Sequence, residues 1–448
     1  MNVQEQLEKL DEHLAPLQKT EKDKHDLDVF RRYYEQFISI PSLIDWTKMR
    51  PFNAAQLMEN YDDLPKLSDE EAQKVLSRVA DWEQLWAAPV LNLLITVRDG
   101  KTFLDFSIEQ NELLNKRYNS NVPLFLMDSF RTEQTTKEWL HKHGLQDKVH
   151  QFTQSRCPRI YEDTLLPVVG SPDEGFYPPG HGNVFAALNA CGLLDKLIEE
   201  GRDIIFVSNI DNTAACVDVQ IASVICREDV DYLMEITEKT QQDIKGGTLI
   251  HYENYIKHLE LPHVPEDKVD EFCSLRTFKT FNTNNIWVDL RSVKSKLATM
   301  KLEKLKTGEP VIQLESAIGG AIKNFERVRV VCVHRSRFLP VKKAQDLLVV
   351  MGNAFVTDPT TGTLRLNPER SSPQAPIVHL SAKYEYVDEF LKHFPYIPDM
   401  LELETLTVKG DVFFGQNIKL KVRIHGNVTI EGDGQLPDGT TIEGQYTV

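Results

Sequence analysis

The residues of this chain that could do chemistry are polar side chains placed after short apolar segments. Asp211 follows the apolar run 204–207 closely, in the sequence Ser208-Asn209-Ile210-Asp211-Asn212. A carboxylate at the carboxyl end of a strand is well placed to hold Mg²⁺ against phosphate oxygens. The alternative is an Asp that caps the next helix. We favour metal or ligand binding, because ligands of α/β sheets bind at that edge.

Two further segments have a composition suited to ligand binding. Pro178-Pro179-Gly180-His181-Gly182-Asn183 precedes a helical stretch, and its glycines allow the backbone to approach a ligand closely. A stiff turn with a surface histidine would have the same composition. Lys342 and Lys343 follow Pro340, where a strand or loop should stop, and a lysine there can neutralise a leaving pyrophosphate. Paired lysines on a surface helix are the common alternative.

The segment 281–285, Phe-Asn-Thr-Asn-Asn, is rich in amides and precedes the apolar residues Ile286 and Trp287. Amides suit sugar hydroxyls, although they also cap turns. Other catalytic motifs are absent from the sequence: it contains no G-x-x-x-x-G-K-[ST], no G-x-G-x-x-G after a strand, no H-E-x-x-H and no G-x-S-x-G. Hydride transfer, P-loop hydrolysis and serine hydrolysis therefore lack sequence support.

Composition defines the class of protein that carries these residues. The chain has 448 residues, of which 41% are hydrophobic, so we expect a globular protein of two or three domains. Its formal net charge of -16 argues against general affinity for nucleic acid or anionic membranes. The six cysteines are widely spaced, which favours reduced thiols. No signal peptide or membrane span is recognisable, so we expect a cytoplasmic protein.

The elements that must position the polar residues can be read from periodicity. Short apolar runs at 123–127, 204–207, 286–288 and 328–333 predict strands, and 132–141 and 183–197 predict helices. This alternation predicts an α/β fold with a mostly parallel sheet and helices on both faces. We expect a helical segment over 1–85, packed on the main domain rather than acting as a docking arm. An α/β domain over 86–366 follows, and then a linker and connecting helix over 367–400.

The C-terminal part, 401–448, follows a different pattern. Eight apolar residues recur at a strict six-residue interval, which is typical of a hexapeptide parallel β-helix. Glycines in the same segment suit the corners of such a coil. An open β-helix end needs a cap or a partner, so self-association through it is an open alternative. The recurring residues are Leu406, Val412, Ile418, Ile424, Ile430, Leu436, Ile442 and Val448.

Taken together and in this order, the motifs resemble those of the UTP–glucose-1-phosphate uridylyltransferase family. The likeness runs from about Val97 to the C-terminus. It includes Thr102-Phe103-Leu104-Asp105, the segments 152–156, 178–182, 207–212, 245–249, 278–287, 313–315 and 335–342, and 397–401. The resemblance implies a nucleotidyltransferase-type α/β domain followed by a left-handed β-helix. It further implies the substrates UTP and glucose 1-phosphate, the product UDP-glucose and the cofactor Mg²⁺.

The resemblance also assigns roles to individual residues. Gln154 and Gly180 are similar to uridine contacts, and His181, Asn209 and Ile210 to contacts on the sugar-phosphate side. Asp211 resembles the Mg²⁺ ligand, and Lys342 the cation that bridges the nucleotide phosphates. The remaining residues, which are Asn284, Asn285 and Glu315, would face the sugar hydroxyls. The implied reaction is an in-line attack of glucose 1-phosphate on the α-phosphorus of UTP, with positioning and charge neutralisation as the sources of catalysis.

One departure from the family pattern bears on activity. Family members carry a loop of the form L-N-G-G-L-G-T-x-M-G-x-x-G-P-K-S before the Thr-Phe-Leu-Asp segment, whereas this chain has Val90-Leu91-Asn92-Leu93-Leu94-Ile95. Loss of one oxyanion-type donor costs roughly 100- to 1000-fold in rate. The alternative is therefore a catalytically impaired relative that binds UDP-sugar or assembles with active subunits. A third hypothesis, pyrophosphorylase activity on an N-acetylhexosamine phosphate, is less favoured by the motifs around His181 and Lys342.

Overall fold

The structure is a computed structural model that describes residues 2–448, except 53–57, 85–94, 169–174, 228–229, 242, 302–303, 308–310 and 422–426. The chain forms two compact units. Unit 1 contains Met1–Val90, Leu114–Asn209 and Val217–Arg335, and unit 2 contains Leu91–Leu113, Ile210–Cys216 and Ser336–Val448. The four-part domain division expected from the sequence stays a prediction.

The centre of unit 1 is an eight-stranded sheet of order β2-β18-β12-β15-β11-β3-β6-β7. β15 runs antiparallel to both of its neighbours, and every other pair is parallel. The prediction of a mixed α/β fold with a mostly parallel sheet is therefore confirmed. The strands are β2 (Met58–Asn60), β18 (Val328–Cys332), β12 (Tyr232–Glu238), β15 (Thr280–Asp289), β11 (Ile204–Asn209), β3 (Val79–Gln84), β6 (Leu124–Asp128) and β7 (Val149–Thr153).

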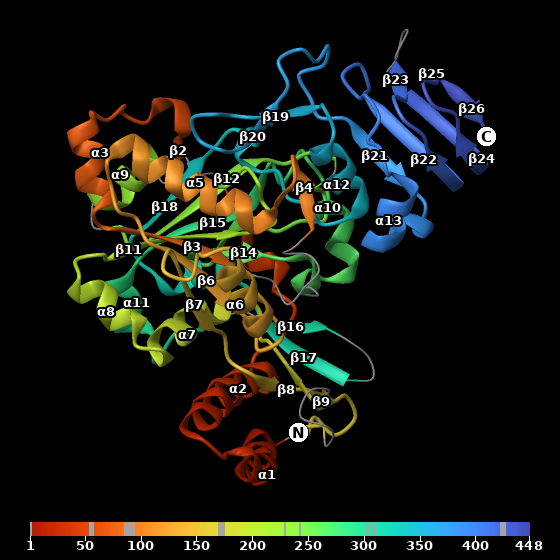
Figure 1. The fold of residues 1–448 in the computed structure, drawn as a ribbon. Helices are drawn as coiled ribbons and strands as arrows, with labels where there is room; N and C mark the ends of the chain where they lie inside the picture. Colours follow the sequence, from red (N-terminus) through yellow and green to blue (C-terminus); the bar gives the residue numbers. More distant parts are fainter. Residues whose placement is uncertain are drawn as a thin grey trace. The chain divides into compact units, whose positions relative to one another are not determined.

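Helices cover both faces of this sheet (Figure 1). α3 (Asp69–Leu76) and α9 (Val219–Arg227) pack together, as do α7 (Val184–Ala190), α8 (Leu193–Glu199) and α11 (Leu290–Lys296). α6 (Glu133–Lys142) packs on β7. The helix expected over 183–197 is divided, because Gly192 takes a left-handed backbone between α7 and α8. The core below these helices includes Trp82, which packs on Phe125 and Phe152.

The N-terminal helices α1 (Val3–Leu14) and α2 (Glu21–Ser39) are part of unit 1, and helix was expected here from the spacing of apolar residues. Their apolar faces share a core with Cys157, Ile160 and Tyr177. The expectation of helix up to residue 85 is wrong in part, since β1 (Met49–Pro51), β2 and β3 lie in that range. β3 is an interior strand of the central sheet, and its buried Asp81 and Glu83 hid it from a search for apolar runs.

Smaller sheets complete unit 1. One has the order β1-β13-β14, with β13 (Thr248–Tyr252) and β14 (Tyr255–Leu259), and packs beside α10 (Val269–Phe272) through a separate apolar cluster. A second has the order β16-β17-β9, with β16 (Lys304–Thr307), β17 (Val311–Ser316) and β9 (Ile160–Tyr161). A third pairs β10 (Phe176–Tyr177) with β8 (Cys157–Pro158).

Unit 2 is built from short hairpins, helices and parallel strands. It contains β4 (Thr96–Arg98), β5 (Lys101–Thr102), α12 (Ala344–Met351), and the hairpin of β19 (Phe355–Thr357) with β20 (Leu364–Leu366). α5 (Phe103–Tyr118) begins in this unit. Arg370 ties the segment after β20 to the C-terminal part, because its guanidinium donates to the carbonyl groups of Met400, Leu403 and Gln374.

The C-terminal strands stack in parallel, as expected of a β-helix, but without the constant step that the hexapeptide pattern implies. The register advances by 22 residues where Thr405 pairs with Asn427 and Lys419 with Thr441. It advances by 28 residues where Ile377 pairs with Thr405, and by 16 where Thr429 pairs with Gln445. Three six-residue sides would advance it by about 18. Leu406, Ile418, Leu436 and the other recurring residues are buried, except that Val448 is half-exposed and Ile424 lies outside the described residues. Leu406 pairs with Val428 and Val408 with Ile430, and all four are buried.

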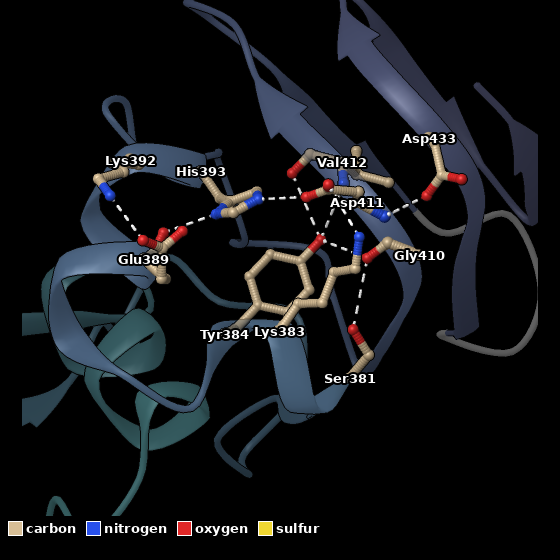
Figure 2. Close-up of polar contacts among 10 residues, drawn as sticks. All are labelled: Ser381, Lys383, Tyr384, Glu389, Lys392, His393, Gly410, Asp411, Val412 and Asp433. Atoms are coloured by element: carbon tan, nitrogen blue, oxygen red, sulfur yellow. Dashed lines mark hydrogen bonds and ion pairs between the residues drawn. The ribbon is translucent and has the colours of Figure 1, made fainter.

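These strands are β21 (Ile377–Leu380), β22 (Thr405–Phe414), β24 (Asn427–Leu436) and β26 (Gln445–Thr447), with β23 (Lys419–Lys421) paired to β25 (Thr441–Glu443). α13 (Val387–His393) is attached to β22 by polar contacts (Figure 2). Nε2 of the buried His393 lies 2.6 Å from Oδ1 of Asp411, while Lys383 Nζ donates to the other oxygen at 2.9 Å. The Lys383 and His393 contacts lower the pKa of Asp411.

We predict that Gly410→Ala destabilises the β22–β24 pair. Gly410 has φ +93°, and a Cβ there would lie 2.1 Å from the carbonyl oxygen of Gly432. The backbone conformation alone costs about 1–3 kcal/mol for a non-glycine residue, and the clash adds to it. Hydrogen exchange of the amides in 405–414 and 427–436 measures the loss.

Gly439→Ala is the matched control, because Gly439 also has a positive φ, +74°, but nothing lies within 4 Å of its Cβ position. We expect it to cost only about 1–2 kcal/mol. Equal destabilisation by the two substitutions would contradict the close approach at Gly410.

Candidate functional site

The turn that contains Gly180 and His181 lies against the end of β17. Ser316 N–H donates to the Pro179 carbonyl at 2.8 Å. A Cβ at Gly180, which has φ +85°, would meet the Ser316 carbonyl at 2.8 Å and Glu315 Cβ at 3.5 Å. Only glycine allows so close an approach in that conformation. The structure therefore brings together three residues selected from the sequence, Gly180, His181 and Glu315.

One nitrogen of the His181 imidazole acts as a hydrogen-bond acceptor. Nδ1 accepts a hydrogen bond from the backbone N–H of Ile318 at 3.2 Å. A neutral ring in this arrangement carries its proton on Nε2, which makes that nitrogen a donor. The geometry thus directs one hydrogen-bond donor of His181 away from the backbone of Ile318.

Gln154 is tied to the same turn through its neighbour. Ser155 N–H donates to Oδ1 of Asn183 at 2.7 Å, and Asn183 Nδ2 donates back to Ser155 Oγ at 3.2 Å. The Gln154 side chain is buried, and its Oε1 accepts no hydrogen bond within the described part of the chain. A buried acceptor without a donor is costly, so this oxygen is suited to a donor supplied by a ligand.

The asparagines at the end of β11 and within β15 form a second group. Asn284 Nδ2 donates to Oδ1 of Asn209 at 2.9 Å. Asn285 is fully buried, and its Nδ2 donates to Oε2 of Glu235 in β12 at 3.1 Å. The register between β12 and β15 shifts at this point, with a bulge between Met234 and Ile236. The bulge allows the adjacent side chains of Asn284 and Asn285 to have different partners.

Asp211 and Lys342 form an ion pair within unit 2, through Oδ2 and Nζ. Two antiparallel segments hold them in place: Val341 N–H donates to the Asp211 carbonyl at 3.0 Å, and Leu339 N–H to Oδ1 of Asn212 at 2.8 Å. Asp346 then accepts the backbone N–H of Lys342 at 3.0 Å at the start of α12. Ile210 begins this segment and is buried.

The second carboxylate oxygen of Asp211 is available to a ligand. Oδ1 is buried and has no hydrogen-bond partner among the described residues. Burial raises the pKa of the Asp211 carboxyl, and the Lys342 ammonium opposes the rise. No group of three or more His, Cys, Asp or Glu in the described ranges is arranged to hold a metal ion. Mg²⁺ is commonly held by one or two carboxylates together with substrate phosphates, so the unpaired oxygen fits such an ion.

Sequence reasoning did not single out the residues that position these groups. These positioning residues make the hydrogen bonds described above, and they are Asn183, Asn212, Glu235 and Asp346. Asn183 and Asn212 lie inside the recognised motifs, and this was the only signal for them. Partners distant in sequence, such as Glu235 for Asn285, are not indicated by any local pattern. The loop difference at Val90–Leu94 lies outside the described residues.

The large, mostly parallel sheet with polar residues at its strand ends defines an α/β protein, and the comparisons place this protein among the nucleotidyltransferases. The sequence model of a family described as UTP–glucose-1-phosphate uridylyltransferase matches residues 27–421. The chain belongs to this family. No helix of the described residues is both long enough and apolar enough to cross a membrane.

Individual relatives agree with this assignment. The chain is 41% identical over 422 residues to UTP–glucose-1-phosphate uridylyltransferase 2 of Dictyostelium discoideum. The aligned region covers 90% of this chain and 83% of that protein. The chain is 38% identical to the UTP–glucose-1-phosphate uridylyltransferase of Saccharomyces cerevisiae, covering 93% and 86%. A variant of Leishmania major UDP-glucose pyrophosphorylase, crystallised with UDP-glucose, superposes with a TM-score of 0.87 at 27% identity, over 99% of both chains.

We predict that stability depends on pH through Asp128, which holds the segment leading to Gln154. Asp128 is fully buried, accepts hydrogen bonds from Thr132, Thr136 and Gln151, and its carbonyl accepts Gln154 N–H at 2.9 Å. Burial raises the pKa of its carboxyl to about 6. Since the folded state then binds the proton more tightly than the unfolded state, this contribution to stability is present at low pH. It is lost as pH rises through about 6.

Asp128→Asn removes the titration. Relative to the variant, the parent chain should lose about 1.4 kcal/mol of unfolding free energy between pH 5 and pH 7.5. Urea unfolding of both proteins at the two pH values measures the difference. A stability difference between the two proteins that does not change with pH would contradict the elevated pKa.

Proposed function

We propose that this chain transfers the uridylyl group of UTP to glucose 1-phosphate and releases UDP-glucose and pyrophosphate. The observation that carries the proposal is the family match over residues 27–421. Relatives of the same described activity cover most of the chain and match more than four-fifths of their own length. The comparisons do not favour the impaired alternative, which rests on the loop difference near Asn92 alone, and the test below distinguishes the two.

The nucleotide would be held by Gln154 and Gly180. The buried Oε1 of Gln154 lacks a hydrogen-bond donor among the described residues, and a uracil N–H would supply one. The Cβ position of Gly180 is occupied by the backbone of Ser316, so the glycine is required for that close approach. The unpaired oxygen supports the assignment of Gln154 to uridine, and the assignment of Gly180 rests on its place in the same turn as His181.

The sugar phosphate would be bound by His181, Asn209 and Ile210, with Asn284, Asn285 and Glu315 toward the hydroxyls. The pair formed by Asn209 and Asn284 supports this assignment most directly, because its amides are held in fixed orientations next to a strand end. Asn285 would act through its neighbours, since its amide is already engaged by Glu235. His181 would donate from Nε2, given the acceptor role of its Nδ1.

Asp211 would hold the divalent cation, for which we propose Mg²⁺, through its unpaired Oδ1. When bound, this ion neutralises phosphate charge and orients the phosphate oxygens. Lys342 would exchange its contact with Asp211 for a contact with the nucleotide phosphates, where its ammonium offsets charge that develops on pyrophosphate. Asp346 and Asn212 hold the backbone around both groups, so the exchange needs only side-chain motion.

With these contacts, catalysis needs no covalent enzyme intermediate. The phosphate oxygen of glucose 1-phosphate attacks the α-phosphorus of UTP in line, the new oxygen–phosphorus bond forms, and the bond to pyrophosphate breaks. The residues contribute orientation and charge neutralisation. We further propose that the protein works in the cytoplasm, that its C-terminal strands form a left-handed β-helix, and that copies of the chain associate through that segment.

Steady-state release of pyrophosphate from UTP and glucose 1-phosphate with Mg²⁺ tests the function. We expect turnover at an ordinary enzymatic rate, and a much lower rate with N-acetylglucosamine 1-phosphate. Asp211→Asn and Lys342→Met should each lower kcat by about 100-fold or more. The first removes the negative charge that would hold the divalent cation, and the second removes the positive charge that would face the phosphates. Lys343→Met is the control: it removes the same charge one position later and should remain within about threefold of the parent.

The same assay separates the remaining alternatives. Binding of UDP-glucose in a calorimetric titration without turnover would support the impaired relative. Preference for the N-acetylated sugar phosphate would contradict the assignment to glucose. An equal loss in the Lys342 and Lys343 variants would contradict the specific role of Lys342.

A further inference from the structure

A buried histidine outside the proposed set of contacts is linked to Asn209 and Asn284 by hydrogen bonds. His258 lies in β14 with a side chain that is 2% exposed. Its Nε2 is 3.2 Å from Nδ2 of Asn282. The orientation of that amide is fixed, because Oδ1 of Asn282 accepts the backbone N–H of Asn284 at 2.9 Å. The group that faces His258 is therefore the NH₂, which can only donate.

This pattern determines the tautomer of His258. Nε2 must accept and so carries no proton, and the proton of the neutral ring lies on Nδ1. Nδ1 is 3.5 Å from Oε1 of Glu260, without a hydrogen bond to it, so the carboxylate favours the proton on this nitrogen by charge alone. If both ring nitrogens were protonated, the Nε2–H of His258 and the NH₂ of Asn282 would be two donors facing each other.

The next step along the network is an unusual backbone conformation. Asn284 has φ +61°, a region that non-glycine residues adopt at a cost of about 1–3 kcal/mol when neighbouring contacts hold them there. The hydrogen bond from its N–H to Asn282 is such a contact. In this conformation Asn284 Nδ2 reaches Oδ1 of Asn209 at 2.9 Å. His258 is thus connected to the Asn209–Asn284 pair through a single intervening side chain.

Two glycines hold the imidazole from different segments. A Cβ at Gly247 would lie 2.4 Å from Nε2 of His258, and a Cβ at Gly319 would lie 2.9 Å from Nδ1. The Gly319 Cβ would also lie 3.0 Å from Nδ2 of Asn282. The ring therefore has no room to shift without breaking its contact with Asn282. A ring held this closely can serve as a fixed hydrogen-bond acceptor for Asn282, which is more than core packing alone would require.

We propose that His258 is a positioning residue, which acts through Asn282 to hold Asn284 and Asn209 in the orientation that binds glucose 1-phosphate. The proposal rests on the proposed function, because it takes those two asparagines as contacts to the sugar phosphate. His258 itself would not touch substrate. Its loss would weaken the binding of glucose 1-phosphate and leave the binding of UTP unchanged.

Two substitutions separate hydrogen bonding from packing. His258→Phe keeps an aromatic ring between Gly247 and Gly319 but has no acceptor for Asn282. His258→Gln restores an acceptor oxygen near the position of Nε2. We expect the Phe variant to raise KM for glucose 1-phosphate by about five- to twentyfold, the effect of one lost hydrogen bond, with KM for UTP within about twofold. The Gln variant should stay within about threefold of the parent for both substrates.

The outcomes that overturn the proposal are specific. Unchanged KM values in the Phe variant, or equal changes for both substrates, would reduce His258 to a packing role. Equal defects in the Phe and Gln variants would have the same meaning. Thermal unfolding of each variant identifies any loss of folding.

A measurement on the unchanged chain keeps the proposal testable if the Phe variant fails to fold. Nitrogen NMR of protein labelled at its histidine rings, with the Gln variant used for assignment, should show His258 as the neutral tautomer protonated at Nδ1. The signal should respond to glucose 1-phosphate. A proton on Nε2, or no response to the sugar phosphate, would contradict the network. Absence of turnover in the parent chain contradicts the proposed function alone, since the tautomer is read without catalysis.

Discussion

The arrangement of the polar residues in unit 1 depends on how the buried carboxyl group of Glu235 is satisfied inside the central sheet. Glu235 is fully buried in β12, and it accepts hydrogen bonds from Asn285 Nδ2 at 3.1 Å and from Trp287 Nε1 at 2.9 Å. A buried carboxyl without such partners would be strongly destabilising. Both donors come from β15, the single antiparallel strand of the sheet, so this requirement also fixes the position of β15.

The consequences extend along β15. The bulge opposite Glu235 turns Asn285 toward the carboxyl group and leaves Asn284 in a left-handed conformation that reaches Asn209. Thr283 Oγ1 donates to the carbonyl of Glu235 at 2.8 Å, which holds the bulge from the other side. The buried carboxyl group of Glu235 therefore sets the different partners of the Asn284 and Asn285 amides. His258 in β14 secures the same conformation through Asn282 of β15.

In unit 2 the comparable constraint is the pairing of two loop segments. Asn212 accepts Leu339 N–H with Oδ1 and donates to the Arg337 carbonyl with Nδ2, so one side chain replaces part of a strand pair. This pairing sets Asp211 beside Lys342, while Asp346 satisfies the backbone at the start of α12. In a chain with a net charge of -16, the positive charge of Lys342 is thereby held beside a single carboxylate.

Local patterns in the sequence were enough to predict the strands β6, β11 and β18, the helix α6, and the segments that contain Asp211, His181 and Lys342. They succeeded because apolar periodicity and turn residues act over a few neighbouring positions. They failed for β3, whose buried Asp81 and Glu83 break the apolar pattern. For the C-terminal strands they predicted the parallel stacking but not the register, which is set by pairing between coils. Only the tertiary structure decided the partners of Gln154, Asn285 and His258, because each contact joins residues far apart in the chain. Hydrogen bonding and burial of that kind depend on which strands become neighbours, and no local pattern carries that information.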